Sequence, residues 1–170
     1  MAILTQADFT GKYALSQGMY STTKITDYID IYEKKYLIDL LGVDLYNLFD
    51  ADLVAGSGTP TEARFLVIWN ALTFDYSNCV YISDGIKEML KGYIYYEFLK
   101  DSINEMTPIG NVKPIGENSQ RASTLFTTMY SRYNDAIKTS RVIQKYIDVN
   151  DLSYNYDDYN GFQKSYNYWL

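Results

Sequence analysis

The sequence contains no histidine, and Cys79 is its single cysteine. Without histidine the chain cannot form a Ser-His-Asp or Cys-His nucleophile arrangement, a histidine-containing zinc site or the Glu-x-x-His pairs of di-iron helical bundles. One cysteine can form neither an intrachain disulfide nor a zinc cluster, and such sparing use is typical of a reducing compartment. We therefore expect a protein that is not an enzyme and that carries no cofactor and no metal ion.

Phosphate-binding and membrane-spanning signatures are missing as well. The sequence has no GxxxxGK[ST] loop and no GxGxxG turn, and its glycine-rich GSGTP run at 56–60 lies between predicted helices. No apolar run approaches the ~20 residues that cross a bilayer, and MAILTQADFTGKY lacks the basic region and apolar core of a secretory signal. These absences predict a soluble protein that is made inside the cell and has no membrane partner.

Positive charge is scarce, with 15 Lys and Arg against 21 Asp and Glu and a net charge of −6. Binding of nucleic acid by phosphate neutralisation needs clustered basic residues. Lys34-Lys35, Lys138, Arg141 and Lys145 do not form such a stripe. We expect no specific DNA binding, although an acidic wall would suit a protein that surrounds DNA without binding it.

Two groups of carboxylates remain as candidates for chemistry. Asp27, Asp30 and Glu33 share one face of a predicted helix at spacings of three. Solvated surface charges that pair with lysine neighbours explain this face better than catalysis does. Asp157-Asp158 could bind a cation, but two adjacent acids without a third ligand make a weak site. Neither group predicts an active site.

Helical spacing of apolar residues dominates the chain from Lys24 onward. It predicts helices over 24–42, 43–56, 61–74, 84–106 and 119–148. Gly92 inside the fourth helix indicates the close approach of another helix, because a mid-helix glycine costs up to ~1 kcal/mol relative to alanine. The last helix, about 45 Å long at ~1.5 Å per residue, would form the spine of the fold.

The segments between these helices contain no series of alternating strands. Residues 76–84 are predicted to connect two helices, with a short extended segment at Cys79 to Ile82. The expected architecture is therefore all-α, a bundle of four to five helices with one long C-terminal helix. We divide the chain into an irregular N-terminal arm (1–22), a helical domain (23–150) and an aromatic C-terminal arm (151–170).

A projecting hairpin or long loop is predicted near 107–118. Pro108 and Pro114 rule out a continuous helix there, and each begins a Pro-Ile-Gly run. Two interpretations remain open. The segment is an ordinary loop between helices, or it is an assembly element in which Ile109, Val112 and Ile115 contact a neighbouring subunit.

Aromatic residues are unusually common, with 19 tyrosines in the chain. Tyrosine suits surfaces that become buried on assembly, although a compositional bias would explain the total equally well. The C-terminal arm has the densest cluster, which we predict to be interface residues: Tyr154, Tyr156, Tyr159, Phe162, Tyr166, Tyr168 and Trp169. The alternative is that this arm folds back over its own helices and completes the core.

Four sequence segments together resemble the head–tail connector proteins of tailed phages, also called adaptor or head-completion proteins. They are EKKYLIDLLGVDLYNLF (33–49), SDGIKEMLKGYIYYEFLKD (83–101), PIGNVKPIGENSQRAS (108–123) and YSRYNDAIKT (130–139). The loop followed by Asn-Ser is the most distinctive piece, and the resemblance covers roughly 24–150. The tail beyond 150 matches poorly. The Tyr-, Asn- and Lys-rich composition is similar to that of crAss-like phages.

The resemblance implies a structural virion protein without catalysis or cofactor. Such proteins form a ring, commonly of twelve copies, beneath the portal protein at the head–tail interface, after synthesis in the host cytoplasm. The ring contacts the portal and the next tail or ring component, and DNA passes through it without specific binding. The alternative from the residues alone is a small helical adaptor or regulator that binds one protein partner through its aromatic tail.

Overall fold

The computed structural model describes residues 2–15, 24–102, 105–107, 110–112, 124–156 and 159–162. The helices are α1 (Ile25–Leu41), α2 (Val43–Asp52), α3 (Ala63–Trp69), α4 (Ile86–Ser102) and α5 (Thr124–Tyr154). The strands are β1 (Leu72–Tyr76), β2 (Cys79–Ser83), β3 (Glu105–Thr107) and β4 (Gly110–Val112), and they pair as two antiparallel hairpins. The helical fold is confirmed in outline, but the all-α prediction missed the β1–β2 hairpin.

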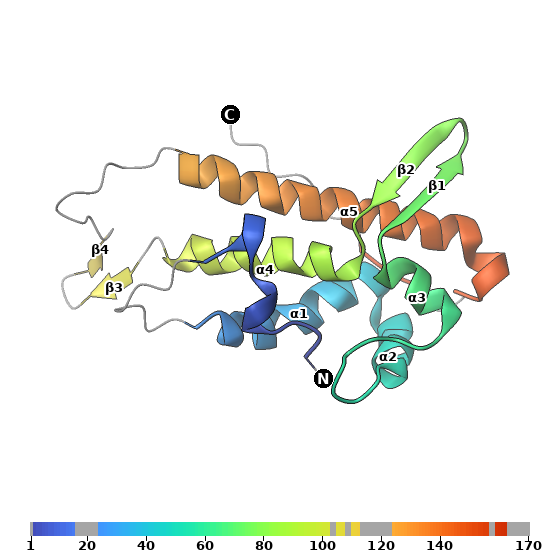
Figure 1. Ribbon diagram of the computed structural model, residues 1–170, viewed down its shortest axis with the longest axis horizontal. Coiled ribbons are helices and arrows are strands. Elements are labelled where there is room, and N and C mark those ends of the chain that lie inside the picture. The colour runs from blue at the N-terminus through green and yellow to red at the C-terminus, as the bar shows by residue number, and fades with distance from the viewer. Residues whose placement is uncertain are drawn as a thin grey trace.

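Three helices form the body of the molecule, with α4 lying between α1 and α5 (Figure 1). Each turns its apolar side chains inward, and the buried ones on α4 include Met89, Leu90 and Ile94. A methyl group at Gly92 would lie 2.8 Å from Cβ of Ala136 and 2.9 Å from the carbonyl oxygen of Arg132. The predicted close helix contact at Gly92 is therefore confirmed, and its partner is α5.

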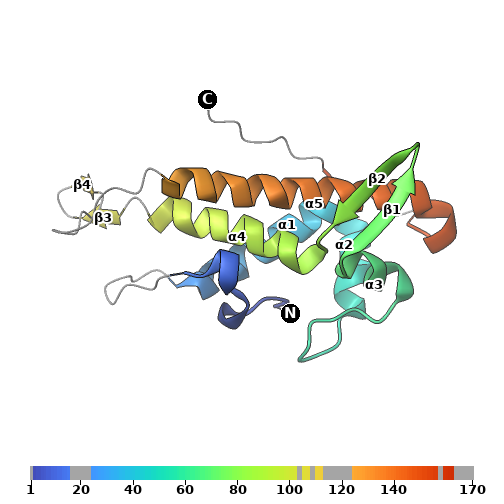
Figure 2. The same cartoon turned by 45° about the horizontal axis from the view of Figure 1, so that its top comes forward.

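The long helix α5 runs along the whole body, as Figures 1 and 2 show. It has 31 residues, and at ~1.5 Å per residue it measures about 46 Å. Its backbone leaves helical geometry at Asn150, where φ is −109° and ψ is 15°. Beyond this kink a further turn continues to Tyr154, so the helix ends later than the predicted residue 148.

The predicted third helix is wrong beyond Trp69. The chain leaves α3 there, and β1 pairs with β2 from Leu72↔Ser83 to Tyr76↔Cys79. Ser77 and Asn78 connect the strands with φ of 50° and 63°. Two consecutive positive φ values define a type I′ turn, whose twist matches that of the flanking strands. The region expected to be a helix end and a connection is therefore a complete hairpin.

The second hairpin spans 105–112 and overlaps the segment near 107–118, which was predicted to be a projecting hairpin or long loop. β3 pairs with β4 from Glu105↔Val112 to Thr107↔Gly110. Val112 lies on β4, whereas Ile109 and Ile115 lie outside the described residues. Figures 1 and 2 place this hairpin toward the opposite end of the long axis from β1–β2.

The N-terminal segment belongs to the body rather than to a free arm. Ile3, Leu4, Phe9 and Tyr13 are all buried in the common core. Two short 3-10 turns, Gln6–Asp8 and Gly11–Tyr13, lead the chain across α1 and α4. The description of 1–22 as an arm is therefore incorrect for residues 2–15, because their apolar side chains find partners within the same chain.

Candidate interaction surfaces

The β1–β2 hairpin has one packed face and one exposed face. On the packed face Phe74 meets Tyr146 of α5 edge to face, with ring centroids 5.2 Å apart, and stacks on Tyr81 at 5.1 Å. On the other face Val80 and Ile82 are 65% and 60% exposed. Side chains alternate across a strand, so packing one face on α5 turns these β-branched residues to solvent. The sequence analysis missed this apolar surface.

The start of the C-terminal arm is a buried part of the body. Tyr156 is 1% exposed, and its hydroxyl donates a hydrogen bond of 2.6 Å to the carbonyl oxygen of Arg64. Nη1 of Arg64 in turn donates to the carbonyl oxygen of Asn155 at 2.9 Å. The prediction of Tyr156 as an interface residue is therefore wrong. Its ring packs into the core of its own chain, and its polar tip is satisfied there.

Residues 159–162 then cross the end of α1. The N–H groups of Asn160 and Phe162 donate to the carbonyl oxygens of Leu41 and Asp39, at 3.3 and 2.7 Å. The last carbonyls of a helix have no partner within the helix, so this segment caps α1. A methyl group on Gly42 would lie 2.7 Å from the carbonyl carbon of Asn160, so only glycine allows this crossing.

Gln144 of α5 contacts both α1 and the C-terminal segment where they cross. It is 2% exposed, and its Nε2 donates to the carbonyl oxygens of Leu40 and Phe162 at 3.2 and 3.1 Å. A methyl group on Gly161 would come within 2.1 Å of the Leu40 carbonyl oxygen. One side chain therefore ties α1, α5 and the C-terminal segment together where the backbones approach most closely.

The other predicted tail residues have different positions. Tyr159 packs half-buried against the core, and burial together with Asp148 raises the pKa of its hydroxyl to about 12. Phe162 is 68% exposed and remains a predicted contact residue. Tyr154 ends α5. The residues outside the described part of the chain are Tyr166, Tyr168, Trp169 and the Asp157-Asp158 pair.

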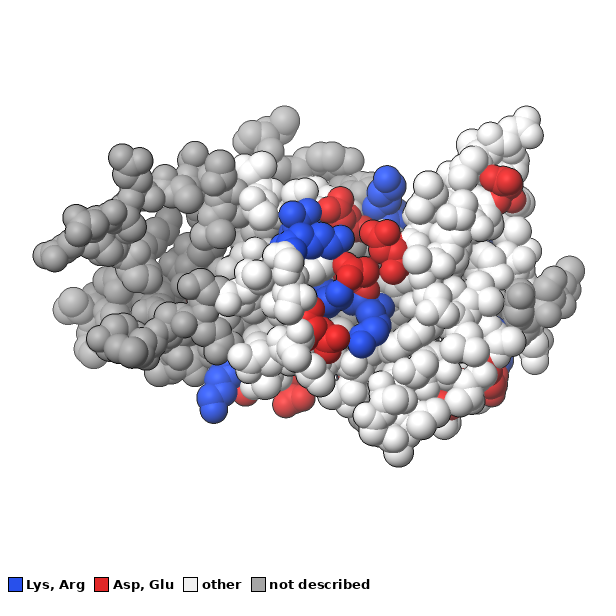
Figure 3. All heavy atoms as spheres, viewed as in Figure 1, with Lys and Arg blue, Asp and Glu red and all other residues white. Residues whose placement is uncertain are grey.

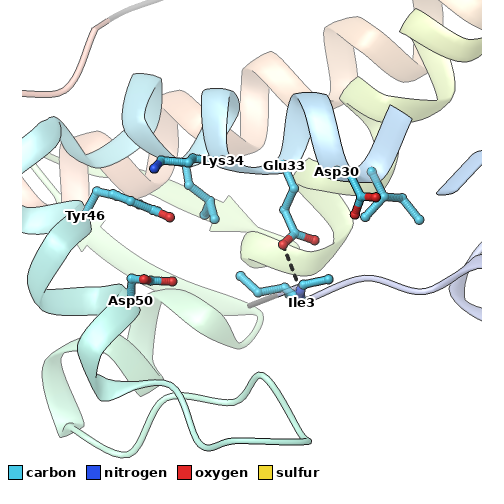
Figure 4. A pocket seen from close by; sticks show the side chains of 9 residues that line it. Ile3, Asp30, Glu33, Lys34, Tyr46 and Asp50 are labelled. Carbon is cyan, nitrogen blue, oxygen red and sulfur yellow. Dashed lines mark hydrogen bonds between the residues drawn. The ribbon is translucent and has the colours of Figure 1, made fainter. Parts of the chain in front are cut away.

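Glu33, expected on a solvated face, is a buried residue with 6% exposure. Its carboxylate oxygens accept hydrogen bonds of 2.8 Å from the backbone N–H groups of Ile3 and Leu4, and Figure 4 shows the bond from Ile3. Burial raises the pKa of Glu33, and the two N–H groups oppose that rise. The function of this carboxylate is therefore to fasten the N-terminal segment to α1.

A pocket of about 220 Å³ lies beside Glu33. It is lined by Ala2, Ile3, Ile29, Asp30, Glu33, Lys34, Leu37, Tyr46 and Asp50. Both oxygens of Glu33 are already occupied by backbone donors, and within the described residues no three Asp, Glu or Cys side chains group so as to hold a metal ion. The pocket is explained as space beside the bound N-terminal segment, because Ala2 and Ile3 form part of its wall.

Four tyrosines lie on the surface of the body near α4, and we call them the tyrosine face. They are Tyr28 and Tyr32 of α1, Tyr96 of α4 and Tyr133 of α5. All four rings are partly exposed. Tyr28 stacks on Tyr32 at 5.8 Å, and Tyr96 meets Tyr133 at 4.4 Å. Buried rings of Tyr36 and Tyr93, stacked at 4.2 Å, join the two pairs from below. The two partly exposed pairs are therefore connected through buried aromatic rings.

A buried polar group supports the tyrosine face. The hydroxyl of Tyr36 donates to Oε1 of Glu97 at 2.6 Å, and Lys100 pairs with the other carboxylate oxygen of Glu97. Burial, followed by the bond to Glu97, raises the pKa of Tyr36, which stays protonated as a donor. The arrangement fixes the positions of these rings.

Charged residues of both signs are mixed on the side shown in Figure 3. The ion pairs of the described residues include Lys87 with Asp8, Lys12 with Glu88 and Arg132 with Asp135. This side therefore carries no dense basic patch of the kind that neutralises phosphates. Among the helices in the described ranges, none has both the length and the apolar character needed to span a membrane.

Comparison with known proteins gives no match. A scan against protein-family models, a search of curated proteins and a search of solved structures each find nothing similar to this chain. Its function is therefore argued from the residues and their geometry.

Proposed function

We propose that this protein is a structural virion subunit that forms a ring beneath the portal of a tailed phage and joins the capsid to the tail. The resemblance of 24–150 to connector proteins supports this function. It would have no catalytic activity and no cofactor. Its partners would be further copies of itself, commonly twelve in such rings, together with the portal and the next tail or ring component.

The exposed face of the β1–β2 hairpin is the observation that carries the proposal. Val80 and Ile82, 65% and 60% exposed, form an apolar contact surface at one end of the body, and the β3–β4 hairpin lies toward the other end. A ring subunit needs two different surfaces, because heterologous interfaces close a ring by rotation. In the proposed ring, the two hairpins toward opposite ends would supply such a pair.

The charge supports a channel that DNA passes through without specific binding. The net charge is −6, and acidic walls repel phosphates instead of holding them. In this role neutral and acidic residues would face the duplex, and the apolar hairpin face would contact protein. The proposed location is therefore the head–tail interface of the virion.

Mass measurement of the purified chain, alone and mixed with the cognate portal, tests the proposal. We expect a ring or a portal complex, and we expect Val80→Ser with Ile82→Ser to lose it while the helical circular dichroism is unchanged. Ile31→Ser is the matched control, because Ile31 is 63% exposed but lies on α1. A chain that stays monomeric and joins no portal or tail complex would refute the connector function.

The loop residues give a second test of the same proposal. Replacing Ile109, Val112 and Ile115 by serine should impair subunit contacts more than the stability of the monomer. Equal losses of assembly and monomer stability would assign this segment to the fold of its own chain. The measurement is the mass distribution of the variant beside its thermal unfolding curve.

A small adaptor that binds one protein through its C-terminal tail is the second candidate. Phe162, 68% exposed at the last described position, favours it because a large exposed ring is a typical contact residue. Phe162→Ser would then abolish binding to a single partner, whereas the hairpin variants would have no effect. That pattern separates an adaptor from a ring subunit.

A further inference from the structure

An Asn-Gly pair, Asn160 and Gly161, lies in the middle of the segment that crosses the end of α1. Asn160 is exposed, and the N–H group of Gly161 has no hydrogen-bond partner among the described residues. Asparagine followed by glycine is the sequence most prone to deamidation, because glycine has no side chain to shield the attacking nitrogen. No other asparagine of the sequence precedes a glycine, so the chemistry points to this position.

The reaction at this pair needs only groups of the chain and water. The backbone nitrogen of Gly161 loses its proton and forms a bond to Cγ of Asn160, and the side-chain nitrogen leaves as ammonia with a proton taken from water. Water then opens the five-membered succinimide ring. Opening at Cγ gives aspartate. Opening at the backbone carbonyl carbon gives isoaspartate, whose backbone runs through Cβ and Cγ and is one carbon longer.

The crossing opposes this attack, because it holds the backbone on both sides of the reacting groups. The N–H groups of Asn160 and Phe162 donate to carbonyl oxygens of α1 at 3.3 and 2.7 Å. A methyl group on Gly161 would clash with the carbonyl oxygen of Leu40 and lie 2.9 Å from Nε2 of Gln144. Bringing the nitrogen to Cγ requires rotation of the Asn160 backbone, for which these contacts leave no room. We therefore expect the reaction only when the segment opens locally.

The products of the reaction no longer fit the crossing. Asn160 and Phe162 bind carbonyl oxygens of Leu41 and Asp39, two residues apart on α1, and an extra backbone carbon in isoaspartate breaks this register. Both products also add a carboxylate at the residue bound to the C-terminal end of α1. The free carbonyl groups of a helix end carry partial negative charge, so the new carboxylate is repelled there.

We propose that Asn160 is a deamidation site that the crossing protects, and that its reaction makes release of the C-terminal segment irreversible. While the segment is bound to α1, the amide is preserved. Once the segment has left, conversion of Asn160 prevents its return, so a partner that captures the segment no longer competes with α1. The inference concerns the chain itself and holds whether or not that chain forms a connector ring.

Deamidation kinetics of the full chain test the protection. The folded chain is incubated at mildly alkaline pH, and aspartate and isoaspartate at position 160 are followed by mass spectrometry of its peptides. We expect it to react at least roughly tenfold more slowly than the free peptide 157–164, and Gln144→Ala to react roughly tenfold faster than the wild type. Lys138→Ala, an exposed change on the same helix, should not alter the rate. Asn160→Gln should abolish the signal, because glutamine would have to form a larger ring.

Hydrogen exchange tests the irreversible release. The isoaspartyl chain, separated from the amide form by ion exchange, should exchange faster at 159–162 and unchanged in α4. A wild type that deamidates as fast as the peptide, or a Gln144→Ala chain that reacts at the wild-type rate, would overturn the protection. Unchanged exchange at 159–162 would overturn the irreversible release. If Gln144→Ala fails to fold, the wild type in low urea replaces it, and its deamidation must accelerate before helical circular dichroism is lost.

Discussion

The hydroxyl group of Tyr156 donates a hydrogen bond to the carbonyl oxygen of Arg64 at 2.6 Å, which joins the C-terminal segment to α3 across 92 positions of the chain. The Arg64 guanidinium returns a bond to the carbonyl oxygen of Asn155 and lies over the ring of Phe65 at 4.6 Å. The aromatic tail therefore begins as a structural element. At its last described residue, Phe162, it presents an exposed ring.

Tyr156→Ala should destabilise the isolated domain. Loss of a fully buried aromatic ring costs about 3–5 kcal/mol, and Tyr156→Phe, which removes only the hydrogen bond, should cost about 1 kcal/mol. Urea denaturation followed by circular dichroism measures both. Phe162→Ala is the control and should change the unfolding free energy by less than about 0.5 kcal/mol, because its ring is exposed. Similar losses at both positions would contradict the distinction between a buried Tyr156 and an exposed Phe162.

Alanine substitutions at Gly42 and at its control Gly56 test how tightly the C-terminal segment packs where it crosses α1. Both have positive φ, +81° and +92°, but a methyl group at Gly56 meets nothing within 4 Å, whereas one at Gly42 lies 2.7 Å from Asn160. Gly56→Ala should cost about 1–2 kcal/mol from backbone strain alone. Gly42→Ala should cost a further 1–3 kcal/mol, roughly, because the segment must move. Equal unfolding free energies for the two variants would show that the crossing is not tight.

The helices could be predicted from the sequence because their signal is local. Apolar side chains at spacings of three and four gave α1, α2 and α4 within a few residues at most ends, and Gly92 indicated the contact with α5. The β1–β2 hairpin also has a local signal in the sequence. LTFDY and CVYIS are rich in β-branched and aromatic residues, and only two residues, Ser77 and Asn78, separate them.

Burial of the two chain ends could not be predicted in this way. Glu33 became a core residue because Ile3 and Leu4, 30 and 29 positions away, supply its donors. Tyr156 and Phe162 have the same aromatic character, and no periodic pattern separates the buried ring from the exposed one. Such contacts depend on tertiary packing between distant segments, which single-sequence periodicity does not contain.

The turn of the β1–β2 hairpin should tolerate glycine and reject valine at Asn78. Its φ of 63° is accessible to asparagine and glycine, but a β-branched residue there is strained. Asn78→Val should lower the unfolding free energy by about 1–2 kcal/mol, and Asn78→Gly should leave it unchanged or raise it slightly. Thr73→Val, on the exposed face of β1, controls for added apolar surface. A neutral Asn78→Val would mean that the hairpin contributes little to global stability.

Glu33→Gln should change how stability depends on pH. Burial raises the pKa of Glu33 above its ordinary value of 4.5, so just above that pH the folded chain holds more protons than the unfolded one. Stability from this group is then fully present below about pH 4.5 and falls as pH rises through the raised pKa, by at most about 1.4 kcal/mol per pH unit. The difference in unfolding free energy between the wild type and Glu33→Gln, measured by urea denaturation, should therefore shrink between acid and neutral pH.

Asp8 and Glu88, whose pKa values are lowered, act in the opposite direction but are present in both chains and cancel in the difference. A wild-type advantage that grows with pH would show that the N–H groups of Ile3 and Leu4 outweigh burial at this carboxylate.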